Sequence, residues 1–399
     1  VKCFIREILM KKNLIVSLVC FWADILLYKF ITPEHISKYE KILLVRLDEI
    51  GDVVLMTPLL REMRSNYPEA DITLIVKPQV YNLVELCPYV NKVMTFDRYE
   101  GRFSFILNII KAFRYAKVFL WKEKYDLVIV PRWDTDYYGA SFLAFFSGGI
   151  ERLAYSETVN VGKQLLNRGY DRFFTKVFHT SDIKHEVLRN LDWINFLGGK
   201  VKNYSLELWS NKEDRKVCNS FGGESKNCFR IAVVTSAGAK RKEWDINNFI
   251  DLIQRIRSKK NVEIVLLGGG YNTYKLGEIL KKSCKVEYDF IGKTTLRETV
   301  EILKTCSCFI GCDTGPMHLA AACGLSGVTF FANKNSIVEQ YGLDTAKRFG
   351  PWNSDIVTFE PKLMSAGCEN GCKKEFAHCI NQIAVDDVYE ELKNILNIK

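Results

Sequence analysis

The fold is decided by residues 41–66, which read KILLVRLDEIGDVVLMTPLLREMRSN. The first seven, 41–47, are a short apolar run with β-branched members, which is typical of a buried strand. A polar loop follows at 48–52, and residues 53–66 then predict a helix. A strand that passes through such a loop into a helix predicts the first unit of a parallel α/β sheet.

The same alternation continues on both sides of a polar break near residue 220. Further strands are expected at 71–77, 92–96 and 125–131 before the break and at 230–235, 262–267, 308–312 and 327–331 after it. We therefore predict two Rossmann-like domains with parallel sheets. The predicted parts are a helical extension at 1–40, a first domain at 41–210, a linker at 211–228, a second domain at 229–385 and a last helix at 386–399.

The composition describes a folded protein and excludes several classes. Of 399 residues, 48% are hydrophobic and 26% charged, which excludes disordered and collagen-like chains and small disulfide scaffolds. The net charge of +9 fits contact with the phosphates of a nucleotide, a glycan or a lipid surface, but it is too small to predict nucleic-acid binding. Thirteen cysteines, several of them in apolar runs, favour a reducing cytoplasmic location.

Residues 1–40 differ from this regular pattern. The run 14–31 is apolar but is interrupted by Asp24 and Lys29, and basic residues precede it. Its length is borderline for a spanning helix, and the charge near its middle argues against a span. Two readings stay open, namely an amphipathic helix in a membrane interface and a helix packed on the body of the protein.

Three loops between a strand and a helix carry residues suited to chemistry. In the first, Asp52 either caps a helix or faces a cleft as a general base. In the second, 313–318 (DTGPMH), the residues either cap a helix or bind an anion on its first amides. In the third, 236–244 (SAGAKRKEW), the basic residues are either a solvated surface or a clamp for a diphosphate. No Walker A loop is present, and the glycine run 268–270 lacks the spacing of a dinucleotide fingerprint.

Cysteines cluster only near the C-terminus, where Cys368, Cys372 and Cys379 lie close together and His378 precedes the last of them. Thiolates and an imidazole at such spacing are ligands for zinc or iron. The spacing is not that of the common CxxC zinc sites. Two alternatives to a structural zinc or iron site therefore stay open, namely that two of the cysteines form a disulfide and that all three are free thiols.

Taken together, these segments resemble the bacterial heptosyltransferases, glycosyltransferase family 9. Residues 42–76 are similar to the opening of that family, 309–324 (FIGCDTGPMHLAAACG) to its second signature, and 235–253 (TSAGAKRKEWDINNFIDLI) to its donor loop. The resemblance spans about 41–397 and implies a GT-B fold. In that fold two Rossmann-like domains, one for the acceptor and one for the donor, face each other across a cleft, and the last helix often crosses back to the first domain.

The resemblance also implies an activity. It implies an inverting transfer that needs no metal, from a nucleotide-sugar, with ADP-heptose favoured, to a glycan or lipid-linked glycan of lipopolysaccharide type. Such an enzyme is expected in the cytoplasm, with a peripheral place on the inner membrane if 1–40 binds there. Asp52 matches the catalytic base of the family. The donor-binding positions implied are Ser236, Gly238, Lys242, Asp313, Thr314, Gly315 and His318, and the acceptor-side candidates are Asp48, Arg132 and Asp134.

Two other functions stay open. One is a GT-B transferase that uses another nucleotide-sugar or a protein acceptor. The other is a catalytically silent protein that binds a sugar nucleotide as an assembly partner. The presence of Asp52, Lys242 and Asp313 together argues against silence, because a base and a phosphate clamp are both retained.

Overall fold

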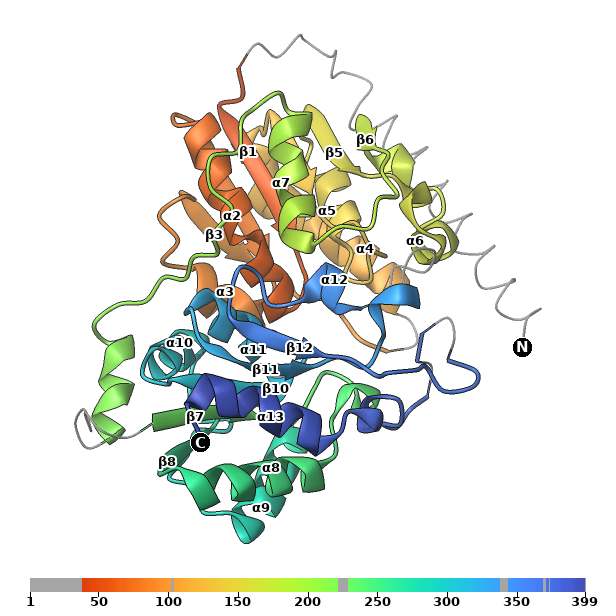
Figure 1. Cartoon of the computed structure of the whole chain (residues 1–399). Coiled ribbons are helices and arrows are strands. Elements are labelled where there is room, and N and C mark those ends of the chain that lie inside the picture. Colours follow the sequence, from red (N-terminus) through yellow and green to blue (C-terminus); the bar gives the residue numbers. More distant parts are fainter. Residues whose placement is uncertain are drawn as a thin grey trace.

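The computed structural model describes residues 38–101, 104–221, 229–337, 344–368, 371–372 and 374–398 (Figure 1). The predicted extension, 1–40, lies outside these ranges apart from its last three residues. Two six-stranded sheets, in which all strand pairs are parallel, confirm the predicted α/β class with two sheets. Within the described ranges, no helix combines the length and the apolar composition that crossing a bilayer requires.

The first sheet has the strand order β3-β2-β1-β4-β5-β6. Its strands are β1 (Lys41–Arg46), β2 (Asp71–Val76), β3 (Lys92–Thr95), β4 (Leu127–Val130), β5 (Glu151–Tyr155) and β6 (Lys176–Phe178). Its helices are α2 (Ile50–Asn66), α3 (Pro78–Val84), α4 (Ser104–Tyr115), α5 (Ala140–Phe146), α6 (Val161–Leu166) and α7 (Glu186–Phe196), with short turns η2 (Ala116–Leu120), η3 (Trp121–Glu123), η4 (Glu157–Val159) and η5 (Tyr170–Phe173). Side chains of β1 alternate between two apolar layers, one with Ile42 and Leu44 and the other with Leu43 and Val45. Because both faces of the sheet are covered, the strand is apolar throughout.

The second sheet has the strand order β12-β11-β10-β7-β8-β9. Its strands are β7 (Phe229–Val234), β8 (Val262–Leu266), β9 (Tyr288–Asp289), β10 (Cys308–Cys312), β11 (Ser326–Phe330) and β12 (Ile356–Phe359). Its helices are α8 (Ile246–Lys259), α9 (Tyr271–Ser283), α10 (Leu296–Lys304), α11 (Gly315–Ala322), α12 (Ala346–Phe349) and α13 (Val385–Leu396), with short turns η6 (Asp214–Phe221), η7 (Lys240–Lys242), η8 (Asn335–Ile337) and η9 (Ile380–Gln382).

The loops that carry the predicted site residues follow the central strands of the two sheets. β1 pairs with β4 in the first sheet, and β7 pairs with β10 in the second. In each sheet the strand order reverses direction between the two partners, which makes the gap between them a topological switch point. Ligands of open α/β sheets bind at the carboxyl ends of the strands at such points.

The two domains meet through the first turns of α2 and α11. A Cβ added to Gly51 would lie 2.5 Å from Cδ2 of His318, and one added to Gly315 would lie 2.8 Å from Cβ of Ile50. The absence of a side chain at these two glycines therefore permits the approach. Apolar residues of α2 and α11 belong to one buried cluster that runs through both domains.

The chain passes from the first domain to the second between Glu207 and Ser210. The amide of Glu207 donates to Oγ1 of Thr57 on α2, whereas the hydroxyl of Ser210 donates to Glu301 on α10. The turn η6 also packs on α10. We therefore propose a domain boundary just before the predicted linker, 211–228, whose described part packs with the second domain.

The last helix, α13, lies on the second domain. It packs against α8 and β11 (Figure 1). Val388, Leu392 and Leu396 are buried in the core of that domain. The prediction that 386–399 crosses back to the first domain is wrong, because the apolar stripe of this helix is buried on its own domain.

Candidate active site

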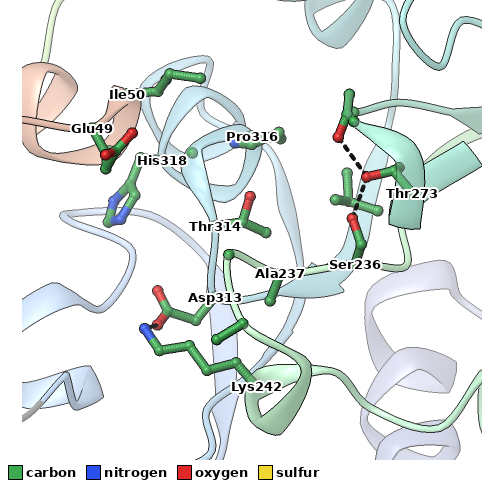
Figure 2. Close-up of a pocket in the computed structure, with 18 of the residues that line it drawn as sticks. Glu49, Ile50, Ser236, Ala237, Lys242, Thr273, Asp313, Thr314, Pro316 and His318 are labelled. Atoms are coloured by element: carbon green, nitrogen blue, oxygen red, sulfur yellow. Dashed lines mark hydrogen bonds and ion pairs between the residues drawn. The ribbon is translucent and has the colours of Figure 1, made fainter. Parts of the chain in front are cut away.

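A cleft of about 990 Å³ lies between the two domains. Its walls come from the loops after β1 and β4 on the first domain and after β7, β8 and β10 on the second. Figure 2 shows Lys242, Asp313 and Thr314 of the second domain, with Glu49 and Ile50 of the first beside His318. Of the predicted catalytic, donor-side and acceptor-side residues, all line this cleft except Asp48.

Asp52 lies in the first turn of α2 and faces the cleft. The alternative that it caps this helix is wrong, because the N-cap residue is Glu49. The Asp52 side chain is 20% exposed, and its Oδ1 lies 3.3 Å from Nη2 of Arg46. Burial raises the pKa of Asp52 to about 6, and the opposing effect of Arg46 offsets only part of that rise. This carboxyl group is therefore mostly ionised at neutral pH and is a stronger base than an ordinary aspartate.

Two arginines enclose Asp48 behind the cleft wall. Nε of Arg46 lies 2.6 Å from Oδ2 of Asp48, and Nη1 of Arg132 donates to the other oxygen. Asp48 and Arg46 are each 1% exposed. Asp48 therefore acts as the shared counter-ion that holds Arg46 beside Asp52 and holds Arg132 at the cleft.

Arg348 of α12 joins the second domain to the first. Its buried Nη2 lies 2.7 Å from Oδ2 of Asp134 and 2.6 Å from Oε1 of Glu186. Burial alone would lower the pKa of Arg348, but the two carboxylates outweigh it and hold the pKa above its ordinary value. The sequence contained no local signal for this residue, because its partners lie 214 and 162 positions away.

Lys242 lies on the opposite wall between two carboxylates. Its Nζ lies 2.9 Å from Oδ2 of Asp313 and 2.9 Å from Oδ2 of Asp344. Burial alone would lower the pKa of Lys242, but the two carboxylates raise it above its ordinary value, so the amine is charged. The side chain of Asp344 is 44% exposed, which leaves it room to turn towards solvent. Sequence reasoning did not identify Asp344.

The start of α11 opens onto the cleft beside Lys242. Thr314, and not Asp313, occupies the N-cap position, so the alternative that Asp313 caps this helix is wrong. The Thr314 side chain makes no capping hydrogen bond. In the first turn Pro316 has no N–H and the amide of Met317 donates to the carbonyl of Thr314, so Gly315 supplies the amide that this helix start offers to a ligand. His318 is 4% exposed, and burial lowers its pKa to about 3, so the ring is neutral. Its Nδ1 has no hydrogen-bond partner among the described residues.

Part of the second wall was missed by sequence reasoning. The glycine run 268–270, which follows β8, lines the cleft together with Thr273. Gly268 and Gly270 have φ values of 123° and 91°, which glycine adopts without strain. Oγ1 of Thr273 lies 2.5 Å from Oγ of Ser236, and this contact joins the loops after β7 and β8 (Figure 2). The available signal was a glycine run at the end of a strand, but we set it aside because its spacing is not that of a dinucleotide fingerprint.

The C-terminal cysteines come together outside the cleft wall. Nε2 of His378 lies 3.1 Å from Sγ of Cys368 and 3.5 Å from Sγ of Cys379, and Nδ1 lies 3.5 Å from Sγ of Cys372. All three cysteines are buried. An imidazole binds one ion through only one of its two nitrogens. With one ligand atom from each residue, Cys368, Cys372 and His378 form a group whose ligand atoms lie within 4.8 Å of one another, and Cys379 is not part of that group. His378 joins the three cysteines that the sequence singled out.

Comparison with known proteins gives a consistent result. Residues 120–370 match the family described as "Glycosyltransferase family 9 (heptosyltransferase)". Lipopolysaccharide heptosyltransferase 3 of Escherichia coli K12 is 22% identical to this chain over 321 residues, which cover 77% of this chain and 84% of that protein.

Two solved structures share the fold. A glycosyl transferase family 9 protein from Veillonella parvula superposes with a TM-score of 0.70 at 19% identity, over 92% of this chain and 99% of that one. ADP-heptose lps heptosyltransferase II of E. coli superposes with a TM-score of 0.65 at 18% identity, over 90% of this chain and 98% of that one. These likenesses confirm the GT-B arrangement.

We expect Arg348→Met to destabilise the protein by about 3–5 kcal/mol, because Asp134 and Glu186 would lose a buried counter-ion. Urea unfolding followed by tryptophan fluorescence measures this loss. The matched control is Arg255→Met, which removes two surface ion pairs, one with Asp251 on α8 and one with Asp386 on α13, and should leave the unfolding midpoint nearly unchanged. Equal midpoints for the two variants would contradict the role given to Arg348.

Proposed function

We propose that this chain, which belongs to glycosyltransferase family 9, transfers heptose from ADP-heptose to a glycan of lipopolysaccharide type, with inversion and without a metal cofactor. The observation that carries the proposal is the pairing of two unlike walls across one cleft. Asp52, a half-buried carboxyl group with a raised pKa, lines the first-domain wall. Lys242 and the start of α11 line the second. A base and a clamp for a departing diphosphate are the two groups that this transfer needs.

The donor would lie against the second domain. Lys242 and the Gly315 amide at the start of α11 offer positive charge and a hydrogen-bond donor to a diphosphate. Lys242, Asp313 and Asp344 together carry a net negative charge, so a donor must displace one carboxylate. The exposed Asp344 is the one that can turn away. Neutral His318, whose buried Nδ1 has no hydrogen-bond partner among the described residues, lines the cleft next to this position.

The transfer step would use Asp52 as the base. Its carboxylate takes the proton of an acceptor hydroxyl while that oxygen forms a bond to the anomeric carbon. The bond between that carbon and the diphosphate breaks, and its electron pair leaves with the diphosphate. A single displacement of this kind inverts the anomeric carbon. Arg132 and Asp134 line the same wall of the cleft as Asp52, which supports the proposal that they contact the acceptor.

We further propose that the enzyme works in the cytoplasm on a glycan or lipid-linked glycan at the inner membrane. Two of the relatives named above are, by their names, lipopolysaccharide heptosyltransferases. Cys308 and Cys312 are thiols in the second sheet, as a reducing compartment favours. Membrane binding by residues 1–40 stays a prediction, because almost all of this segment lies outside the described residues. The presence of both a base and a clamp for a diphosphate favours an active transferase over a catalytically silent binding protein.

A panel of nucleotide-sugars tests the activity. We expect hydrolysis or transfer with ADP-heptose and at least tenfold less with GDP- and UDP-sugars. Asp52→Asn should lower kcat by about 10²–10⁴-fold while the Kd for ADP changes less than threefold, because a general base acts on the reaction and not on donor binding. Asp251→Asn, on the surface of α8, is the matched control. If the Asp52 variant keeps its turnover, the base is another residue. If the wild type turns over none of the nucleotide-sugars, the catalytically silent binding protein is favoured.

The pH profile tests the environment of Asp52. A base must be unprotonated to act, so kcat/KM should fall about tenfold per unit as the pH drops below about 6 and level off above it. Arg46→Met removes the positive charge that lowers this pKa, so the acid limb should move upward by about one unit. Arg46→Lys, which keeps the charge, should restore most of the profile. An acid limb at the same pH in all three proteins would show that Asp52 does not control it.

We also propose that Cys368, Cys372, Cys379 and His378 hold one structural zinc or iron ion. Three sulphurs and an imidazole are ligands that both metals accept. The ligand atoms of Cys368, Cys372 and His378 lie within 4.8 Å of one another. The ion would tie together the chain between β12 and α13 and take no part in transfer.

Elemental analysis of the purified protein should find about one equivalent of zinc or iron per chain. Cys372→Ser should lower that content at least fivefold, and a chelator should lower the melting temperature of the wild type but not of the variant. Cys284→Ser, at a buried thiol on α9's C-terminal side, is the control and should keep its metal. A metal-free wild type would refute the site.

A further inference from the structure

The outward face of α4 and η2 is apolar although it is exposed. Ile106, Leu107, Ile110 and Phe113 on α4 are between 37% and 51% exposed. Val118 and Phe119 on η2 are 60% and 43% exposed. A surface helix ordinarily turns polar residues outward, and large contiguous apolar patches are rare on monomeric proteins. We call these six residues the α4 face.

The charges on this segment are almost all positive. Arg114, Lys117, Lys122 and Lys124 are exposed between or beside the apolar residues. The single acidic residue from 104 to 124 is Glu123, which pairs with Lys41 and Lys92. A second copy of the chain docked face to face would therefore set like charges against each other. An apolar face interleaved with Lys and Arg is complementary to lipid headgroups of negative charge.

The local geometry turns these residues outward. The helix passes at Ala116 into the π-helical turn η2, and such an extra residue in a turn shifts the side chains that follow it. Inward contacts are made by Ile109 and Ala112 on α4 and by Ala116 and Leu120 on η2. The helix already buries one apolar side on α5. Phe113 also contacts Trp121 and Phe146, and Phe119 contacts Tyr115, but the exposed parts of the α4 face form a second apolar surface that no other described residue covers.

The helix α4 is linked to the mouth of the cleft through residues 98 and 99. The side chain of Asn108, on α4, accepts a hydrogen bond from the amide of Tyr99 and donates one to its carbonyl. The side chain of Tyr99 is 50% exposed. Arg98 donates to the carbonyl of Tyr137, and its guanidinium lies 5.3 Å from the centre of the Tyr138 ring. Tyr138 lines the cleft. Figure 1 shows α4 at the end of the first domain that faces the second.

From this combination we propose that the α4 face docks on the surface of an anionic lipid bilayer. The apolar side chains enter the boundary between headgroups and acyl chains, and the basic side chains contact the phosphates. Docking there places the cleft mouth next to the membrane. If the function proposed above holds, the glycan of a lipid-linked acceptor reaches Asp52 while its lipid anchor stays in the bilayer. The docking itself does not depend on that function.

Vesicle flotation of the full chain tests the proposal. We expect binding to vesicles of phosphatidylethanolamine and phosphatidylglycerol, little binding to phosphatidylcholine, and release at high salt. Ile106→Ser with Ile110→Ser, and separately Arg114→Glu with Lys117→Glu, should each lower the partition coefficient at least tenfold, since one basic side chain contributes about fivefold. These side chains are exposed, so the thermal midpoint should stay the same.

The matched control is Tyr274→Ser with Lys275→Glu on α9, which changes an exposed aromatic and a basic residue of the second domain. It should bind vesicles as the wild type does. Wild-type binding by both α4 variants would overturn the proposal and assign any membrane contact to residues outside α4. A dimer in light scattering that the α4 variants dissociate, with no change in vesicle binding, would also overturn it in favour of a second copy. Neither readout uses sugar transfer, so failure here and failure of the proposed function are distinguishable.

Discussion

The approach of the first turns of α2 and α11 is the constraint on which the cleft depends. Each helix begins within a few residues of a central strand, so bringing the helix starts together also brings the loops after β1 and β10 together. The approach requires that Gly51 and Gly315 have no side chain. Two helix N-termini that face each other concentrate positive potential between them, which favours an anionic ligand in that space. The position of the cleft and the diphosphate site that we propose in it thus have one physical origin.

Buried charges organise both walls of this cleft. Arg46, Asp48 and Arg132 form one group, Arg348 with Asp134 and Glu186 a second, and Lys242 with Asp313 and Asp344 a third. Removing so many charges from water costs free energy that a hydrophobic core would not cost, so stability alone does not explain them. Their common effect is to fix the ionisation states of the groups that face the cleft. The second group also spans the two domains, so the relative position of the walls is set by the same kind of interaction.

The sequence was a good guide where the chemistry is local. Apolar runs of strand length, each followed by a polar loop and a helix, predicted the central strands of both sheets, because buried parallel strands are apolar on both faces. The loops after β1, β7 and β10 were recognisable because small and charged residues stand together there. The short strands β5 and β6 were not predicted, since they carry Glu151, Arg152 and Lys176 within a few residues and lie towards the edge of the sheet.

By itself, then, the sequence determined the α/β class with two sheets, and it singled out Asp52, Lys242 and the start of α11 as candidate site residues. Only the tertiary structure decided how these groups are used. It placed Arg46 beside Asp52, Asp344 beside Lys242 and Arg348 across the domain boundary, and it put Asp48 behind the wall. It also left an apolar face of α4 exposed. The physical reason is that ionisation and exposure depend on neighbours that are close in space but far apart along the chain, whereas strand and helix formation depend mainly on neighbours a few residues away.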